Sequence, residues 1–263
     1  MKHILRTLLL TLMLGGAGVA SAQVEVQRPR FLILPEAVAN QTSAQQYAQL
    51  LSGARQQGAL NRDAAQARRV REIAQRLIPH GERFNPGIRS WRWEANLLDS
   101  PEINAFAMPG GKIAVYSGLI DKLALSDDEL AAVIGHEIAH AVLEHGRARL
   151  QGQIAQDLGV AAVSSYLGLG DLGTAALAKA AEVAVALPYS RSQEVDADLA
   201  GLEMAARAGY DPRAAVRVWQ KMSRLGGGQP PQWLSTHPDP AKRIREIEEA
   251  LPKVMPLYAA EKR

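Results

Sequence analysis

The chain has 263 residues, of which 47% are hydrophobic and 22% are charged, so it is long and apolar enough for one sizeable globular domain and is not disordered throughout. It contains no cysteine, which excludes disulfides, a thiol nucleophile, cysteine zinc ligands and a lipid-anchored cysteine. The formal net charge is +3 and the basic residues form no stripe interleaved with aromatic residues, so we expect no nucleic acid partner.

The first 22 residues are typical of a bacterial secretory signal peptide. Lys2 and Arg6 give a basic start, an apolar run follows over residues 8–14, and Ala20-Ser21-Ala22 matches the A-x-A cleavage pattern. An uncleaved membrane anchor is the alternative, but the run is shorter than the roughly 20 residues that a span requires. We therefore predict a periplasmic protein, exported by a cleavable signal, with neither a lipid anchor nor a transmembrane span in the mature chain.

After the signal peptide we expect an N-terminal arm (23–60), a catalytic domain (61–255) and a C-terminal tail (256–263). The arm is rich in Gln and Ala, begins extended and is expected to turn helical around residues 43–51. A packing helix is predicted over Asp63–Ile78, where apolar residues recur at helical spacing, and it ends at Pro79-His80-Gly81. His80 lies at this end, where a surface histidine is expected.

Three short strands are predicted ahead of the next helix. They are Trp91–Leu98, Asn104–Met108 and Lys112–Ser117, with Pro109-Gly110-Gly111 as the turn between the last two. We expect a small antiparallel sheet. An exposed edge strand would be able to receive an extended peptide as an additional strand, and a purely structural hairpin is the alternative.

The segment Asp127–Leu150 is predicted to form one amphipathic helix. Ser126 and Glu129 have the spacing of a capping box, and apolar residues repeat along one stripe. His136 and His140 lie four residues apart, so they share one face and can bind one metal ion. They belong to an HExxH string in which Glu137 points about 100° away from His136.

This arrangement suits zinc hydrolysis. Zinc in hydrolytic sites takes three protein ligands and leaves one position for water, while Glu137 is placed to act as the general base. His145 would lie about 140° round the same helix from His140, so we expect a core or helix-end histidine there. Glu194, at the start of a second helix, is the better third ligand, and its alternative role is a helix N-terminal acid.

The rest of the chain is predicted to be mostly helical. Residues 151–187 are rich in Ala, Gly and Leu but interrupted by charged residues, which favours one or two core helices over a transmembrane span. The alternatives are that this segment covers the active-site cleft or touches a membrane surface. Further helices are expected over Gln193–Ala208, from Asp211-Pro212 to Gly226, and over Ala241–Leu251, where Arg243 and Arg245 stand among acidic residues. A loop with Trp233 and His237 precedes the last helix.

Five motifs in order resemble the HtpX-like and CAAX-prenyl-protease-like zinc metallopeptidases, peptidase family forty-eight, and within them the periplasmic BepA-like enzymes. The resemblance extends over about Asp63–Leu251. The motifs are His136-Glu137-x-x-His140, Asn104-Ala-Phe-Ala-Met-Pro-Gly-Gly, Glu194-x-x-x-Asp198, Ala208-Gly-Tyr-Asp-Pro212 and Ser235-Thr-His-Pro238.

The resemblance implies one Zn²⁺ per chain, held by His136, His140 and Glu194, with Asp198 orienting a ligating histidine. It also implies that His237 faces the metal, either stabilising the oxyanion or occupying the fourth metal position in a latent state. The strand after Gly111 is implied to line the substrate cleft. Its residues are Lys112, Ile113, Ala114, Val115 and Tyr116.

We therefore expect an α+β, mostly α, zincin-like metalloprotease with a small antiparallel sheet beside the HExxH helix. The expected function is zinc-dependent endopeptidase activity on misfolded or unassembled cell-envelope proteins, with peripheral contact to the membrane or to outer-membrane assembly machinery. A chaperone or assembly factor with a largely latent zinc site is the alternative. A helical structural protein with a chance HExxH is a third.

Overall fold

The computed structural model describes residues 24–158, 179–180, 182–183, 187–225, 231–237 and 240–263. The expected signal peptide and most of the Ala- and Gly-rich segment lie outside these residues. The elements before the HExxH helix are α1 (Glu36–Gln56), α2 (Ala64–Gly81), a 3-10 turn (Pro86–Ser90), β1 (Glu94–Leu98), β2 (Ala105–Met108), β3 (Lys112–Tyr116) and α3 (Ser117–Lys122). After them come α4 (Asp127–Val142), α5 (His145–Leu158), α8 (Arg191–Arg207), α9 (Ala214–Ser223), α10 (Gln232–Thr236) and α11 (Pro240–Glu261).

The sheet is mixed, with the strand order β1-β3-β2. β2 and β3 pair antiparallel across a turn in which Gly110 and Gly111 have φ of 77° and 81°, a conformation that costs glycine little. β1 is parallel to β3, because the chain crosses from β1 to the far edge, forms β2, and returns to place β3 in the middle. The mostly helical α+β class is confirmed, but the sheet is not purely antiparallel as expected.

α4 is the central helix of the domain. It begins with the expected capping box: the Ser126 hydroxyl accepts the Glu129 N–H, and the Glu129 carboxylate accepts the Ser126 N–H at 2.8 Å. From Glu129 to Val142 every side chain except that of Ala132 is buried, because α2, α8, α9 and β2 pack around the helix. The prediction of an amphipathic helix with one buried stripe is therefore wrong, since α4 is covered on all sides.

α4 also ends at Val142 rather than at Leu150. Glu144 follows with φ of 62°, a left-handed conformation that reverses the chain just past a helix C-terminus. Its carboxylate forms ion pairs with Arg28 and Arg147. α5 then starts at His145 in a new direction, so helical geometry does not relate His145 to His140 as expected from one continuous helix.

α4 and α8 cross at two glycines, Gly135 and Gly201. A Cβ atom on Gly201 would lie 2.9 Å from the His136 backbone nitrogen and 3.0 Å from the Gly135 carbonyl carbon. The two backbones are therefore in direct contact, and this contact brings the start of α8 to the face of α4 that carries His136 and His140.

We expect Gly201→Ala to lower the free energy of unfolding by about 1–3 kcal/mol, because the added methyl meets backbone atoms that cannot rotate away. Gly53→Ala in α1 is the matched control: a Cβ there meets nothing within 4 Å, and alanine favours the helix by about 0.5–1 kcal/mol. Thermal melting of the two variants measures the difference. A Gly201→Ala protein that melts with or above the wild type would contradict the close crossing.

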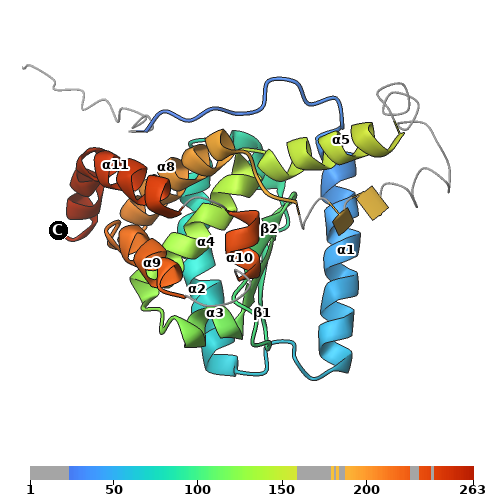
Figure 1. The fold of residues 1–263 in the computed structure, drawn as a ribbon, viewed down its shortest axis with the longest axis horizontal. Helices are drawn as coiled ribbons and strands as arrows, with labels where there is room; N and C mark the ends of the chain where they lie inside the picture. Colours follow the sequence, from blue (N-terminus) through green and yellow to red (C-terminus); the bar gives the residue numbers. More distant parts are fainter. Residues whose placement is uncertain (1–23, 159–178, 181, 184–186, 226–230, 238–239) are drawn as a thin grey trace, which may run out of the picture.

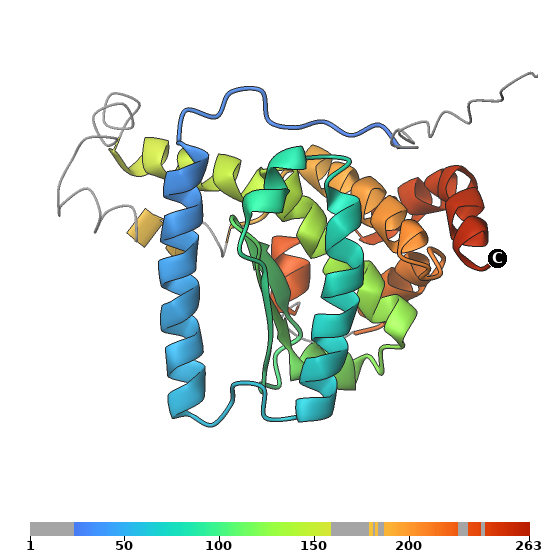
Figure 2. The ribbon, with the colours of Figure 1, turned by 180° about the vertical axis from the view of Figure 1, so that it is seen from behind.

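α1 lies on the other side of the sheet from α2 and α4 (Figures 1 and 2). Tyr47 of α1 packs with Leu98, Met108 and Ala114 of the sheet, and its hydroxyl donates to the Ile113 carbonyl. α1 is longer than the helix expected around residues 43–51.

Residues 24–35, the N-terminal strap, run extended over α8 and α5 before α1 begins (Figure 1). The Val24 N–H donates to Glu203 at 3.0 Å, and the Gln27 N–H donates to Asp196 at 2.9 Å, so α8 holds the first part of the strap. Arg147 of α5 donates to the Leu34 carbonyl at 2.6 Å and holds its end. The extended start of the arm is confirmed.

α11 continues to Glu261 and includes most of the residues expected to form a C-terminal tail. His80 is half-buried near the end of α2, which continues past Pro79 to Gly81. None of the described helices is long and apolar enough to cross a membrane.

Candidate metal centre

Four side chains capable of binding a metal ion converge on one point: His136 and His140 of α4, Glu194 of α8, and His237 directly after α10. One ligand atom of each lies within 4.8 Å of the others, and none of the four residues is more than 4% exposed. His140 Nε2 lies 3.0 Å from His136 Nε2 and 3.4 Å from Glu194 Oε1. Ligands 2.0–2.1 Å from a tetrahedral zinc ion are about 3.3 Å apart, so the spacing fits such an ion.

The orientation of two of the imidazoles prepares them as ligands. His136 Nδ1 lies 3.1 Å from Asp198 Oδ1, and His237 Nδ1 lies 3.0 Å from the Trp233 carbonyl oxygen. A carboxylate and a carbonyl only accept, so a proton on each Nδ1 satisfies them and leaves each Nε2 lone pair for the cluster. Arg243 Nη2, 3.2 Å from His136 Nδ1, and the Thr236 hydroxyl, 2.8 Å from His237 Nδ1, are further neighbours of these nitrogens. Burial lowers the pKa of both histidines below its usual value, which keeps them neutral.

Two buried acceptors in the cluster have no hydrogen-bond partner among the described residues: Glu194 Oε1 and His237 Nε2. An unpaired buried polar atom costs about 1–3 kcal/mol. Burial also raises the pKa of Glu194 to about 8. A cation between these atoms would satisfy both lone pairs and stabilise the carboxylate, so the donor set fits a metal ion.

Arg243 of α11 occupies the opposite side of the two acids. It bonds to Glu194 Oε2 and to both oxygens of Asp198, and its guanidinium lies 4.2 Å from the centre of the Trp219 ring. Burial alone would raise the pKa of Asp198, but Arg243 and His136 hold it below its usual value. Arg243 therefore takes one oxygen of Glu194 and leaves Oε1 for the metal.

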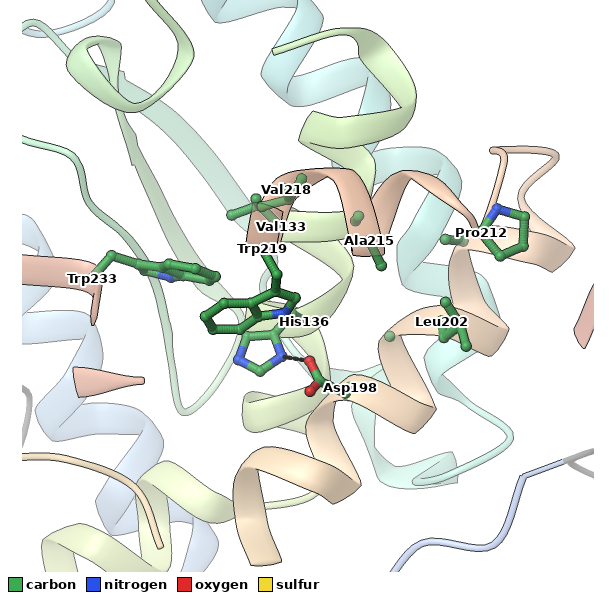
Figure 3. A pocket seen from close by; sticks show the side chains of 12 residues that line it. Val133, His136, Asp198, Leu202, Pro212, Ala215, Val218, Trp219 and Trp233 are labelled. Atoms are coloured by element: carbon green, nitrogen blue, oxygen red, sulfur yellow. Dashed lines mark ion pairs between the residues drawn. The ribbon is translucent and has the colours of Figure 1, made fainter. Parts of the chain in front are cut away.

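Figure 3 shows His136 facing Asp198. The Trp233 ring lies 6.0 Å from the His136 ring and 4.9 Å from the Trp219 ring, measured between centroids. A cavity of about 20 Å³ adjoins them, lined mainly by apolar side chains from α4, α8 and α9. The structure thus places Asp198 beside the His136 ring, while its role in orienting that ring stays a prediction.

Glu137 lies on the same helix, beside the cluster and outside the ligand set. The Trp233 indole N–H donates to Glu137 Oε1 at 2.7 Å, and the main chain of Ala107 in β2 also bonds to the carboxylate. Oε1 lies 3.6 Å from His237 Nε2. Burial raises the pKa of Glu137 to about 8, so its carboxyl group can both take up and release a proton near neutral pH.

The sequence profile of Peptidase family M48 matches residues 64–251, which include every residue of this cluster. The chain belongs to peptidase family M48. The family-level resemblance seen in the motifs is confirmed, and the cluster described above is the candidate metal centre of this M48 domain. The closer likeness to BepA-like enzymes stays a prediction.

Curated relatives include the mitochondrial metalloendopeptidase OMA1 of Bos taurus, 34% identical over 197 residues, which are 71% of this chain and 37% of the relative. OMA1 of Arabidopsis thaliana is 39% identical over 161 residues, 60% of this chain and 31% of the relative. Metalloprotease LoiP of Escherichia coli K12 is 30% identical over 181 residues, 68% of this chain and 71% of the relative. The chain therefore spans well under half of these two OMA1 proteins and more than two thirds of LoiP.

His145 lies near the M48 metal centre but not in it. It is buried at the start of α5, and its Nδ1 lies 3.0 Å from His140 Nδ1, on the side of that ring away from the cluster. Its expected place at a helix end is confirmed, although the helix breaks before it.

The predicted substrate-binding strand occupies a different place from the one expected. β3 is the central strand, so its main chain is bonded to β1 on one side and β2 on the other and cannot take up a peptide as a further strand. Lys112 to Val115 are buried within the sheet, and of these five residues only Tyr116 lines the cavity next to Glu137. The sheet edge beside the M48 centre is β2.

That cavity has a volume of about 140 Å³ and reaches Glu137, His237 and β2. It shares Phe106, Tyr116 and Glu182 with a second cavity of about 620 Å³ between α1 and the sheet. Glu182 and Lys179, from the part of the Ala- and Gly-rich segment that the structure describes, line the larger cavity, in agreement with the alternative that this segment covers the cleft.

Three residues of the M48 site were not predicted: Arg243, Trp233 and Tyr189, whose ring stacks on His140 with centroids 3.7 Å apart. Arg243 had a detectable signal. It lies on one helical stripe with Ile247, Ala250 and Val254, all buried, and a charged residue on an apolar stripe requires buried partners. The other two contacts depend on tertiary packing that no local pattern encodes.

Proposed function

We propose that this protein is a zinc-dependent endopeptidase that cleaves misfolded or unassembled proteins of the cell envelope. The observation that carries the proposal is the convergence of three neutral imidazoles and one carboxylate, with unpaired lone pairs turned inward, next to a separately held Glu137. Nitrogen and oxygen ligands in a tetrahedral arrangement favour zinc among the common metals.

His136, His140 and Glu194 would hold the ion, which when bound supplies Lewis-acid stabilisation of a carbonyl and activates water. Glu137 accepts the proton of the attacking water and passes it to the leaving amine. Trp233 and the Ala107 main chain both bond to the Glu137 carboxylate, which holds it beside the place where the water would bind. The raised pKa of Glu137 suits a group that must gain and lose a proton in each turnover.

The edge of β2 suits an extended substrate. The Tyr116 N–H donates to the Asn104 carbonyl at 3.1 Å, so in this antiparallel pair the main-chain groups of Asn104, Phe106 and Met108 point to β3. Those of Ala105 and Ala107 point to the opposite side, where Glu137 lies. A peptide that adds to this edge places its main chain beside the general base.

The cavity walls indicate apolar side chains in the substrate. Leu50, Phe106, Met108 and Tyr116 line the larger cavity, together with polar groups from α1. Unfolded proteins expose apolar residues that folded proteins bury, which supports misfolded proteins as the substrate class. Placement in the envelope is supported by the signal-like first 22 residues. The OMA1 relatives do not add support for it, because their names place them in mitochondria.

Metal removal tests the enzymatic proposal. We expect purified protein to digest casein, to lose this activity after prolonged dialysis against a chelator, and to recover it when about one equivalent of Zn²⁺ per chain is added. Elemental analysis gives the stoichiometry, and circular dichroism of the dialysed sample shows whether it is still folded. Digestion that continues in a folded, zinc-free sample would contradict the proposal.

His237 has two candidate roles, and they require different tautomers of its ring. With the proton on Nδ1, Nε2 offers a lone pair that can ligate a metal, whereas an oxyanion requires an N–H donor. We therefore propose that His237 occupies the fourth ligand position in a latent state and leaves it before substrate enters.

His237→Ala is expected to raise casein cleavage several-fold relative to the wild type, because it removes the blocking group while His136, His140 and Glu194 remain. Initial rates at saturating zinc measure the effect, with Ser235→Ala on the exposed side of α10 as the control. A fall in kcat of tenfold or more at unchanged zinc content would instead assign His237 to the oxyanion.

A chaperone or assembly factor with a latent metal site is the second candidate. The near-complete burial of the four metal-binding residues favours it, because the site would have to open before a substrate could reach all of them. The two candidates differ in whether the cellular role requires Glu137.

A further inference from the structure

His145 is a buried histidine that the proposed reaction does not use. It is 1% exposed and its only close partner near the metal centre is His140, with the two Nδ1 atoms 3.0 Å apart among the described residues. His140 Nε2 faces His136 and Glu194, so His140 cannot ligate through Nδ1. His145 is therefore placed to act on the metal site through His140 and not as a ligand.

Only one arrangement of protons satisfies this pair when His140 binds a metal. His140 Nε2 must then offer its lone pair, so the proton of the neutral ring is on Nδ1 and donates to His145. His145 Nδ1 must accept, which leaves its own proton on Nε2. Burial lowers the pKa of His145, and an interaction with the Gln27 main chain opposes that shift, as expected if the ring donates to it. Because Nδ1 faces His140, the donor would be Nε2.

Gln27 belongs to the N-terminal strap, which lies outside the matched residues 64–251. The strap is held at this point from two sides. The Gln27 N–H donates to Asp196 of α8, two residues from the ligand Glu194, and the next residue, Arg28, forms an ion pair with Glu144 at the turn that precedes His145. The strap thus contacts both chain segments that bring ligands to the metal.

We propose that His145 is the positioning residue of the ligand His140 and that, through Gln27, it couples the N-terminal strap to metal binding. The other ligating histidine of α4 is oriented by a carboxylate, Asp198. His140 is oriented instead by a neutral imidazole whose own orientation depends on a segment outside the family domain. Coupling of this kind is reciprocal: if the strap favours metal binding, then metal binding favours the ordered strap to the same degree.

Two substitutions separate positioning from packing. In His145→Asn the side-chain oxygen stands where Nδ1 stood and can accept from His140, but nothing reaches Gln27. In His145→Leu both contacts are lost. We expect Zn²⁺ affinity, measured by competition with a chelating dye, to fall about 10–100-fold in His145→Leu and by no more than about threefold in His145→Asn. His80→Leu, at a half-exposed helix end, is the control and should bind as the wild type does.

Hydrogen–deuterium exchange of the full mature chain reports on the strap. In the wild type we expect Zn²⁺ to slow exchange over residues 24–34, and we expect this zinc-dependent slowing to be lost in both His145 variants. Neither measurement requires peptidase activity. The positioning role is overturned if His145→Leu binds zinc as tightly as the wild type does. It is also overturned if the zinc affinity of His145→Leu and that of His145→Asn fall by the same factor. If zinc does not change the exchange rate of the strap in the wild type, the coupling is overturned. If the wild type binds no zinc, the proposed function is overturned as well.

Discussion

Glu137→Gln is expected to bind zinc at the wild-type stoichiometry and to digest casein roughly 10²–10⁴-fold more slowly, the range that follows removal of a general base. Glutamine has the same shape, and its Oε1 can still accept from the Trp233 indole, so the packing around the site is retained. It cannot take a proton from water. Binding and chemistry are therefore expected to separate in this one variant.

Glu129→Gln provides the control on the same helix. Glu129 belongs to the capping box and pairs with Lys221, far from the metal-binding residues along α4, so its substitution should cost stability and not kcat. Casein digestion by Glu137→Gln at the wild-type rate would show that the mechanism is wrong.

The same variant distinguishes a protease from a chaperone in cells. A strain with an envelope defect caused by loss of this protein should be rescued by Glu137→Gln if the role is that of a chaperone, and should not be rescued if peptide cleavage is required. Envelope proteomics of the variant against the wild type would then reveal retained substrates.

Arg243→Met is expected to lower the free energy of unfolding of the metal-free protein by about 3–5 kcal/mol. The arginine is 2% exposed and is the cation that Glu194 and Asp198 share, so its removal leaves two buried carboxylates without a counter-charge. Methionine fills much of the same volume, which limits the contribution of a cavity. Urea unfolding in the presence of a chelator measures the change.

Arg245→Met is the matched control, since Arg245 is exposed on the same helix and should change stability by less than about 0.5 kcal/mol. We also expect Arg243→Met to bind zinc about 10–100-fold more weakly, because Asp198 loses the group that orients it toward His136. A loss of stability below about 1 kcal/mol would show that the acids do not depend on Arg243.

The parts of the site that local patterns encode were predictable. His136, Glu137 and His140 share one helix, and helical periodicity alone places the two imidazoles together. Glu194 was a candidate from its place at the start of a second helix, but the resemblance was needed to choose between its two roles. Asp198 and His237 required the resemblance, because spacing in the chain does not determine how α8 and α10 approach α4. Their placement in the structure agrees with the resemblance, while their roles stay predictions.

Non-local structure accounts for the errors. The helix break at Glu144, which pairs with Arg28 from 116 residues away in the chain, has no signal in the local pattern, so Asp127–Leu150 was expected to be one helix. The place of β3 in the middle of the sheet depends on a crossing after β1 that resembles an ordinary loop in sequence. Arg243 was noted only as standing among acidic residues, although its helical position relative to Ile247 and Ala250 indicated the buried face.

The near-complete burial of the four metal-binding residues has a kinetic consequence. With no more than 4% of any of them exposed, an ion passes between solvent and the cluster only during a local unfolding event. The rate of metal loss to a chelator should then reach a maximum, equal to the rate of local unfolding, that a higher chelator concentration does not raise. Amide hydrogen exchange behaves in the same way when every unfolding event leads to exchange. Because a peptide must reach the same place, we expect loading of the ion and admission of the substrate to share one rate-limiting opening of the fold.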